Sequence, residues 1–267
     1  MKPLLFEAGQ AALRGFLVKP VLCLFDFDGT LAPLISDPAL VNLSPEMQQQ
    51  LQALKRRTPI GIITGRSLAD IQKRLRFEPD HLIGNHGTEG LPGWDRQAPA
   101  NFALCRTWLS LLQPLLSPFG DAVWLEDKSY SLTVHYRHAR DQIWVEKTLL
   151  ACFAKLFPSP RIIFGKFNAS LLPANVGDKG TAVRQLLQAS QIHRALYVGD
   201  DSTDEDVFSM HHPDIFSVRV GADLQTEADY VIKDHDDIKL LLNLLLSLLP
   251  LPASPSDKAE TNSLQSP

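Results

Sequence analysis

Short apolar runs alternate with amphipathic segments in the first part of the chain. Residues 21–27, Ile60–Ile63 and His81–Ile83 are apolar runs of the kind found in strands buried on both faces of a parallel sheet. Helices are predicted to begin after Ser44 and Ser67, because serine is a favoured N-cap and apolar residues then recur at helical spacing. This alternation predicts a parallel sheet covered by helices.

The pattern changes between about residue 91 and residue 173. Residues 131–136 alternate in polarity as a half-buried strand does, and residues 123–125 and 161–164 are further strand candidates. Residues 142–157 show the apolar spacing of an amphipathic helix. Alternating strands together with helices indicate a small α+β module inserted into the sheet domain.

The first pattern resumes after this insertion. A helix is predicted from Lys179, followed by strands at 195–198, Ile215–Val220 and Tyr230–Ile232 and by a closing helix in the apolar run 240–251. The expected fold class is therefore α/β, a Rossmann-like parallel-sheet core domain with an inserted small α+β cap domain. The expected boundaries are 1–91 and 174–251 for the core domain, 92–173 for the cap domain, and 252–267 for a disordered tail.

Charge and composition limit the classes of partner that we expect for this protein. The formal net charge is −4 and the pI is near 6.1, so we expect no basic surface that would bind nucleic acid or anionic lipid. The apolar run 240–251 is too short to span a bilayer, and no signal-peptide pattern is evident, so a cytoplasmic protein is expected. Cys23, Cys105 and Cys152 lie far apart in sequence and are predicted to be buried reduced thiols.

Two carboxylates follow the first predicted strand, in Asp26-Phe27-Asp28-Gly29-Thr30. Residues two apart in a strand share a face, so both carboxylates project the same way and repel unless a cation or a proton lies between them. Metal-assisted phosphoryl chemistry uses such a pair, with Asp26 as nucleophile and Asp28 as general acid and base. Gly29 would let backbone N–H groups approach an anion. An acidic loop without catalytic function is the alternative.

Two further positions could bind an anion. Thr64 and Gly65 follow the second predicted strand, where a hydroxyl and a loop amide can hold a phosphoryl oxygen, although Thr-Gly pairs are also ordinary turn residues. Lys179 lies at a helix N-terminus, which is unfavourable for a cation. A phosphate bound there would offset that cost, whereas a solvated turn lysine is the alternative.

Acidic residues crowd the segment 200–206, directly after a predicted buried strand. Thr203 is expected to cap the next helix, and Asp204 and the acids after it complement the helix dipole. Asp200 and Asp201 lie before the first turn and are not explained in this way. We therefore predict Asp200 as a ligand of Mg²⁺, which prefers carboxylate and water oxygens, with Asp201 and Asp204 supporting the site.

These motifs form one predicted site, because each lies where a parallel strand ends or a helix begins. In this order they resemble the haloacid-dehalogenase-like phosphatases. The resemblance implies an aspartyl-phosphate on Asp26, acid-base catalysis by Asp28, and a type-2 cap domain in the inserted module. It also implies phosphate binding by Thr64 and Lys179, beside which Gly29 and Gly65 are the phosphate-binding positions expected from their loops. The Mg²⁺ ligands that it implies are Asp26, the backbone carbonyl of Asp28, and Asp200.

A narrower resemblance, over about residues 21–249, is to the trehalose-6-phosphate phosphatases. It is carried by residues 84–89 (GNHGTE), 126–128 (EDK), 135–137 (HYR), 165–166 (GK) and 199–205 (GDDSTDE). It implies hydrolysis of trehalose 6-phosphate and sugar contacts by Glu126 and Lys128, for which a surface ion pair is the alternative. The full set of expected substrate-binding residues is Arg66, His86, Glu126, Lys128, His135 and Ser170.

One departure from that family concerns the substrate. Ser170 occupies the position of a sugar-binding glutamate, and Leu172 that of a basic residue. A lost charged hydrogen bond would weaken recognition by about 1.5–3 kcal/mol. Another sugar phosphate, such as sucrose phosphate or glucosylglycerol phosphate, is therefore an alternative substrate.

Two functions from other classes are alternatives to a phosphatase. A phospho-acceptor signalling domain also uses acids, a threonine and a lysine, but its paired acids precede the acceptor, whereas here Asp26 comes first and the acidic cluster last. A non-catalytic sugar-phosphate-binding module is disfavoured because Asp26, Asp28, Lys179 and Asp200 are all present. The expected partners are a small-molecule sugar phosphate and a candidate synthase of the same pathway, with no nucleic acid and no membrane.

Overall fold

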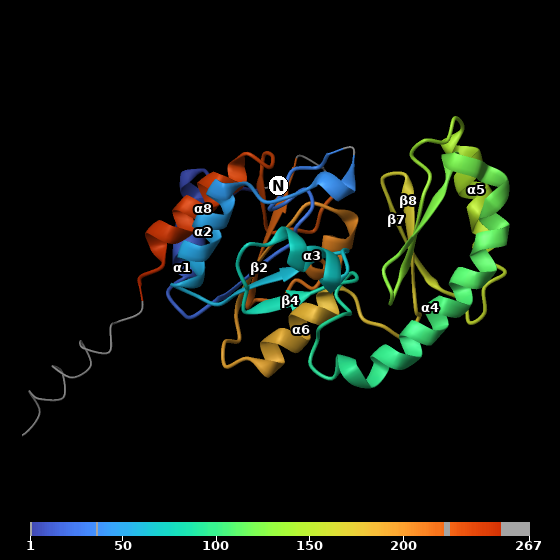
Figure 1. Cartoon of the computed structure of the whole chain (residues 1–267). Helices are drawn as coiled ribbons and strands as arrows, with labels where there is room; N and C mark the ends of the chain where they lie inside the picture. Colours follow the sequence, from blue (N-terminus) through green and yellow to red (C-terminus); the bar gives the residue numbers. More distant parts are fainter. Residues whose placement is uncertain (1, 36, 222–224, 252–267) are drawn as a thin grey trace, which may run out of the picture.

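The protein contains the parallel sheet predicted from the apolar runs, and this sheet with its covering helices forms the larger of two parts (Figure 1). The computed structural model describes residues 2–35, 37–221 and 225–251. Seven strands pair in parallel in the order β1-β11-β10-β9-β2-β3-β4, here called the core sheet. The strands are β1 (Lys2–Pro3), β2 (Leu22–Phe25), β3 (Ile60–Ile63), β4 (His81–Ile83), β9 (Ala195–Gly199), β10 (Ile215–Val220) and β11 (Tyr230–Ile232).

Helices cover both faces of the core sheet, because its strands are apolar on both sides. In β2, Cys23 and Phe25 belong to one buried cluster while Leu22 and Leu24 belong to another, as the two-residue period of a strand requires. The first cluster includes residues of α1 (Glu7–Phe16), α2 (Pro45–Lys55), α3 (Leu68–Arg74) and α8 (Asp237–Leu248). The second includes residues of α6 (Lys179–Ala189) and α7 (Glu205–Phe208).

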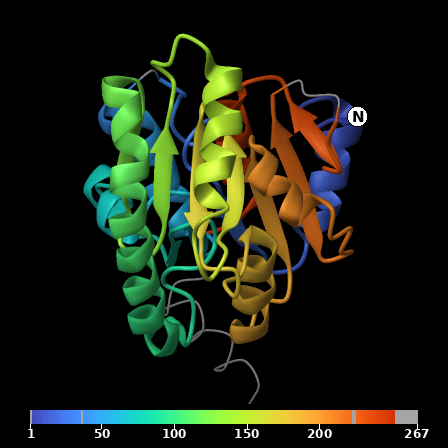
Figure 2. The same ribbon diagram turned by 90° about the vertical axis from the view of Figure 1, so that its right-hand side faces the viewer.

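A second, antiparallel sheet lies beside the first, in the order β5-β6-β8-β7, here called the cap sheet. The chain reaches it after β4 and returns to the core sheet before α6 (Figure 1). Two helices cover its outer face (Figure 2). The elements are α4 (Trp94–Leu116), a short 3₁₀ segment (Ser117–Ala122), β5 (Trp124–Asp127), β6 (Leu132–His135), α5 (Gln142–Phe153), β7 (Arg161–Gly165) and β8 (Asn168–Leu172).

The two faces of the cap sheet differ in chemistry. Leu132, Val134, Ala169 and Leu171 are buried with residues of α4 and α5. Residues of the alternate set, including Glu126, Thr133, His135 and Ser170, share the opposite face, which is turned toward the core sheet (Figure 1). Polar side chains of the cap sheet therefore face the loops of the core sheet.

Several details differ from the sequence predictions. The strand β8 and the helix α4 were not predicted, and the helix predicted at 142–157 ends at Phe153. The predicted N-cap Thr203 is wrong: Asp201 caps a 3₁₀ turn (Ser202–Asp204) in a capping box with Asp204. The three cysteines are buried and free, as predicted. No helix in the described ranges is long and apolar enough to cross a membrane. The predicted tail 252–267 lies outside the described residues.

Candidate active site

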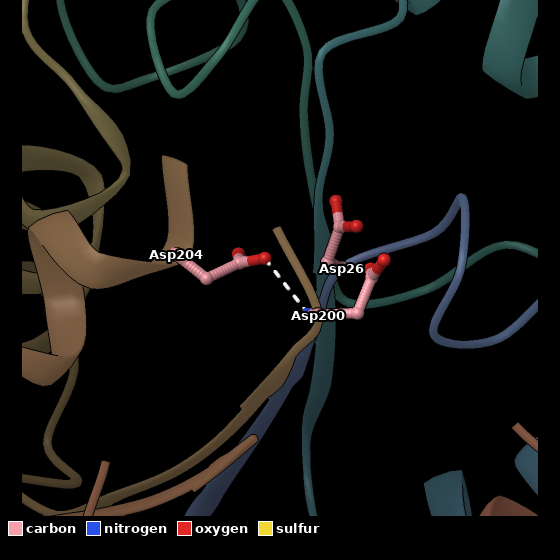
Figure 3. Close-up of side chains that lie close together, drawn as sticks. All are labelled: Asp26, Asp200 and Asp204. Atoms are coloured by element: carbon pink, nitrogen blue, oxygen red, sulfur yellow. Dashed lines mark hydrogen bonds between the residues drawn. The ribbon is translucent and has the colours of Figure 1, made fainter. Parts of the chain in front are cut away.

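Three acidic side chains from distant parts of the sequence meet at the carboxyl ends of β2 and β9 (Figure 3). Asp26 follows β2 directly and Asp200 follows β9, and these two strands are neighbours in the core sheet. Each of Asp26, Asp200 and Asp204 offers a carboxylate oxygen, and these oxygens lie within 4.8 Å of one another. The adjacency of the strands thus creates an acidic cluster suited to a divalent cation.

Burial makes the charge on two of these carboxyl groups costly. Asp26 is only 4% exposed, and this burial raises its pKa well above the ordinary value. The positive charge of Lys179 lowers the pKa of Asp26, whereas the negative charges of Asp204 and Asp200 raise it further. Burial and the neighbouring Asp204 raise the pKa of Asp200 to about 7. A divalent ion at this position would stabilise both carboxylates in their ionised form, so the donor set fits such an ion.

Asp204 belongs to this acidic cluster, but its oxygens accept hydrogen bonds from groups of the protein. Its Oδ1 accepts from Lys179 Nζ at 2.7 Å and from the Tyr197 hydroxyl at 2.6 Å. Its Oδ2 accepts from the backbone N–H groups of Asp200 at 3.0 Å and Asp201 at 2.9 Å (Figure 3). These four donors occupy the lone pairs of the carboxylate. Asp204 therefore fixes the turn that carries Asp200, and Asp26 and Asp200 are left as the candidate metal ligands.

Gly29 makes room for the acidic cluster. Its φ is +85°, and a Cβ added there would collide with the carboxylate of Asp200. Its N–H donates to the carbonyl of Ala32 at 2.7 Å, so the approach of other backbone N–H groups to phosphate at this turn stays a prediction. The hydroxyl of Thr30 donates to Asp200 Oδ1 at 3.0 Å and orients that carboxylate.

Lys179 contacts the nucleophile candidate Asp26, and Thr64 follows the strand beside the one that carries it. Lys179 is 2% exposed, and its Nζ is 2.9 Å from Asp26 Oδ1 and 2.7 Å from Asp204 Oδ1. These carboxylates raise its pKa despite its burial and offset its unfavourable place at the start of α6. Thr64 is buried and follows β3, the other neighbour of β2. Its Oγ1 accepts from the N–H of Arg66 at 3.2 Å, so its own proton is available to donate.

The guanidinium of Arg66 donates hydrogen bonds to other residues of the protein. Its Nε and Nη2 donate to the two oxygens of Asp28 at 2.7 and 2.6 Å, a bidentate pair. Its Nη1 donates to Asp70 at 2.7 Å and its Nη2 to the carbonyl of Pro38 at 3.0 Å. Arg66 is only 8% exposed. Arg66 therefore orients Asp28, and its expected contact with substrate stays a prediction.

The cap sheet places the predicted sugar-binding residues opposite these loops. Glu126 Oε2 is 2.8 Å from His135 Nε2 and 3.9 Å from Lys128 Nζ. The ring of His135 stacks on Trp124 at 4.4 Å. Glu126, Thr133 and Ser170 form one cross-strand row, because Glu126 pairs with Thr133 and Thr133 pairs with Ser170. The hydroxyls of Thr133 and Ser170 are 2.9 Å apart and share one hydrogen bond. A serine at this position adds no charge to the row.

Hydrogen bonds join the strands and turns of the cap sheet to the core loops. Lys128 Nζ donates to the carbonyl of Gly65 at 3.1 Å, and Arg161 Nη2 donates to the carbonyl of Gly177 at 2.7 Å. The hydroxyl of Ser131 donates to Asn85 Oδ1 at 2.5 Å. Sequence reasoning assigned no role to Thr30, Asn85, Arg161 or Tyr197, although Thr30 and Asn85 lie within the motifs at 26–30 and 84–89. Tyr197 also carried a signal, because a tyrosine in a buried strand needs a partner for its hydroxyl.

Comparisons with known proteins agree with this geometry. A sequence model of the trehalose-phosphatase family matches residues 24–230. The trehalose-phosphate phosphatase of Mycobacterium tuberculosis H37Rv is 31% identical over 210 residues, covering 74% of this chain and 53% of the relative. A probable trehalose-phosphate phosphatase of Arabidopsis thaliana is 27% identical over 265 residues, covering 90% of this chain and 70% of the relative. The chain thus spans about half the length of the mycobacterial relative.

Solved structures show the same fold. The C-terminal domain of a Candida albicans trehalose-6-phosphate phosphatase superimposes with a TM-score of 0.69 at 23% identity, covering 94% of this chain and all of that one. The sucrose-phosphatase of Synechocystis sp. PCC6803 superimposes with a TM-score of 0.55 at 20% identity, covering 86% and 98% of the two chains. Since the family match extends from β2 to β11 and so includes Asp26, Lys179 and Asp200, the chain belongs to the trehalose-phosphatase family.

Proposed function

We propose that the protein is a Mg²⁺-dependent phosphatase that hydrolyses trehalose 6-phosphate to trehalose and phosphate through an aspartyl-phosphate on Asp26. The observation that carries this proposal is the convergence of Asp26, Asp200 and Lys179 at one edge of the core sheet. A carboxylate and a phosphate monoester are both anionic, so attack requires nearby positive charge. The buried lysine and a cation at the acidic cluster would supply it.

Asp26 and Asp200 would hold the ion, together with the backbone carbonyl of Asp28 that the family resemblance implies. Mg²⁺ is the proposed ion because the side-chain donors are carboxylates, the oxygen ligands that it prefers. When bound, the ion would neutralise the carboxylates and the phosphoryl oxygens of the substrate. Asp204 and Asp201 would support this arrangement through the turn that carries Asp200.

The protein side chains would then divide the reaction between them. The carboxylate of Asp26 attacks phosphorus and forms the aspartyl-phosphate. Lys179 and the hydroxyl of Thr64 hold the phosphoryl oxygens, and Asp28 gives a proton to the leaving sugar oxygen and later takes one from the attacking water. Arg66 is a positioning residue, because its guanidinium holds both oxygens of Asp28.

The cap sheet is proposed to bind the sugar. Glu126, Lys128 and His135 offer charged and polar groups to sugar hydroxyls on the side turned toward the core sheet (Figure 1). One observation favours a second candidate substrate: Ser170 shares a hydrogen bond with Thr133 and adds no carboxylate to this face. Another sugar phosphate, such as sucrose phosphate or glucosylglycerol phosphate, is that candidate.

Phosphate release from a panel of sugar phosphates tests this function. With Mg²⁺, the full chain should hydrolyse trehalose 6-phosphate faster than sucrose phosphate, glucosylglycerol phosphate and glucose 6-phosphate. Asp26→Asn should abolish release, whereas Asp121→Asn, at an exposed aspartate of the 3₁₀ segment, should not. Equal turnover of the whole panel would contradict the substrate, and activity of Asp26→Asn would contradict the chemistry.

We also propose the setting in which this reaction occurs. The acidic net charge of −4 supports a small-molecule substrate rather than nucleic acid or a membrane surface. A cytoplasmic location beside a synthase that produces the sugar phosphate is consistent with that substrate. The expected domain boundaries remain our proposal, with residues 1–91 and 174–251 as the core domain and 92–173 as the cap domain.

A further inference from the structure

The loop of residues 84–89 presents a histidine to the proposed active site in an unusual backbone conformation. Asn85 and His86 have φ values of +47° and +58°, in the left-handed region that residues other than glycine rarely adopt. The N–H of Asn85 donates to the carbonyl of Arg66 at 2.7 Å, and the N–H of His86 donates to the carbonyl of Thr64 at 2.9 Å. The Asn85 amide donates to Glu89 at 2.7 Å. These bonds hold His86 against the turn that carries Thr64.

The ring of His86 lies directly on Gly65. A Cβ built on Gly65 would be 2.6 Å from Cε1 and 3.0 Å from Nε2 of this ring, too close for a real side chain. The φ of Gly65 is outside the left-handed region, so the space taken by the ring, rather than backbone conformation, requires glycine there. Lys128 of the cap sheet contacts the carbonyl of the same glycine. His86 thus lies where the proposed phosphate-binding turn meets the proposed sugar-binding sheet.

Neither ring nitrogen of His86 has a hydrogen-bond partner within the described part of the chain, although both are shielded from solvent. Burial and the positive charges of Lys128, Lys179 and Arg161 hold the pKa of His86 well below its ordinary value. The ring is therefore neutral, with one nitrogen that donates a hydrogen bond and one that accepts. Buried polar atoms without partners are costly, and a bound ligand would remove that cost.

The surroundings of the ring indicate the chemistry of that ligand. Arg161 Nε is a further buried nitrogen without a partner in the described residues, while Arg161 Nη2 bonds to the carbonyl of Gly177. The charges of Lys128, Lys179 and Arg161 all act on the ring of His86. Three positive charges near the ring favour a ligand with anionic oxygens. The ring nitrogen that accepts a hydrogen bond requires a donor on the ligand, such as a hydroxyl. A phosphate ester with a hydroxyl close to the ester supplies both.

We propose that His86 binds the junction between phosphate and sugar, donating a hydrogen bond to a phosphate oxygen and accepting one from the nearest sugar hydroxyl. This inference rests on the proposed function and deepens it, because it makes His86 a specificity-determining residue. The enzyme then selects phosphate esters of polyhydroxylated alcohols over aryl phosphates such as p-nitrophenyl phosphate, which has no hydroxyl.

Steady-state kinetics of the full chain with Mg²⁺ test this role on two substrates, trehalose 6-phosphate and p-nitrophenyl phosphate. His86→Phe fills the space over Gly65 without either nitrogen, and His86→Asn suits the left-handed backbone but is too short to reach the junction. Each variant should lower the ratio of kcat/KM for trehalose 6-phosphate to that for p-nitrophenyl phosphate by about tenfold. The loss should be mostly in KM for the sugar phosphate.

His211→Asn is the matched control, because His211 is an exposed histidine that also has a left-handed φ, of +44°. It should leave the ratio unchanged. A folded His86 variant with the wild-type ratio overturns the inference, and so does an equal loss on both substrates, which a structural role would produce. If one of the two His86 variants does not unfold cooperatively and so is not properly folded, the kinetics of the other variant test the inference. A wild-type protein that hydrolyses no sugar phosphate would instead contradict the proposed function.

Discussion

At the scale of single residues, neighbouring acids do different work because their partners differ. Asp204 is fully buried and accepts four hydrogen bonds, whereas Asp200 accepts one from Thr30 and offers a carboxylate oxygen within 4.8 Å of one of Asp26. In the sequence both are simply members of an acidic run. Their separate roles depend on contacts with Tyr197 and Lys179, which no local sequence pattern reveals.

Substitution of the two acids should separate metal binding from folding. Asp204→Asn leaves Lys179 with one carboxylate partner in a buried site, so the free energy of unfolding should fall by about 3–5 kcal/mol, measured by urea denaturation. Asp200→Asn should keep most of the stability but lose Mg²⁺ binding in titration calorimetry. Loss of Mg²⁺ binding by a folded Asp204→Asn protein with unchanged stability would contradict this division.

The raised pKa of Asp200 predicts how stability depends on pH. Between about pH 4 and pH 7 the folded protein keeps a proton on Asp200 that the unfolded chain has released, because the folded pKa is about 7. The stability of the metal-free protein should therefore fall as pH rises through this window and then level off. Mg²⁺ needs the ionised carboxylate, so its stabilising effect should grow over the same window.

Thermal melting in EDTA and in Mg²⁺, at pH 5 and pH 8, checks this expectation. The increase in Tm caused by Mg²⁺ should be small at pH 5 and larger at pH 8. Asp200→Asn should remove most of this difference, since it has no group to ionise at that position. An equal Mg²⁺ effect at both pH values in the wild-type protein would be the contrary result.

At the scale of elements, apolar runs predicted the strands well where both faces are buried. The bounds of β3, β4, β10 and β11 agree with those expected from sequence. The helix α4 was missed because Pro99 and Pro114 lie inside it, and proline normally interrupts a helix. The strand β8 was missed because it follows β7 after two residues, one of which, Phe167, turns the chain with a φ of +64°. That turn lacks the usual glycine or asparagine signal.

The cross-strand row of the cap sheet gives a prediction about substrate choice. Ser170→Glu would place a carboxylate in the row that already holds Glu126 and Thr133, facing the core loops. If trehalose 6-phosphate is the substrate, the added charged acceptor should raise kcat/KM for it by about tenfold. Ser170→Ala is the control and should not raise it. An increase for sucrose phosphate instead would favour the second candidate substrate.

At the scale of the whole molecule, distant parts of the sequence form one site because β2 lies between β3 and β9. The sequence could predict this gathering, since the carboxyl ends of neighbouring parallel strands meet at one edge. It could not predict how the cap sheet sits on that edge. That placement depends on contacts such as Lys128 with Gly65 and Ser131 with Asn85, which join residues far apart in the chain.

Covalent labelling of Asp26 tests the central claim most directly. The enzyme would be mixed with trehalose 6-phosphate and Mg²⁺, quenched in acid within milliseconds, and mapped by peptide mass spectrometry. We predict a transient phosphoryl group on Asp26, lost on longer incubation and absent in Asp26→Asn. Phosphate release with no label at any time, or a label on another residue, would contradict the account.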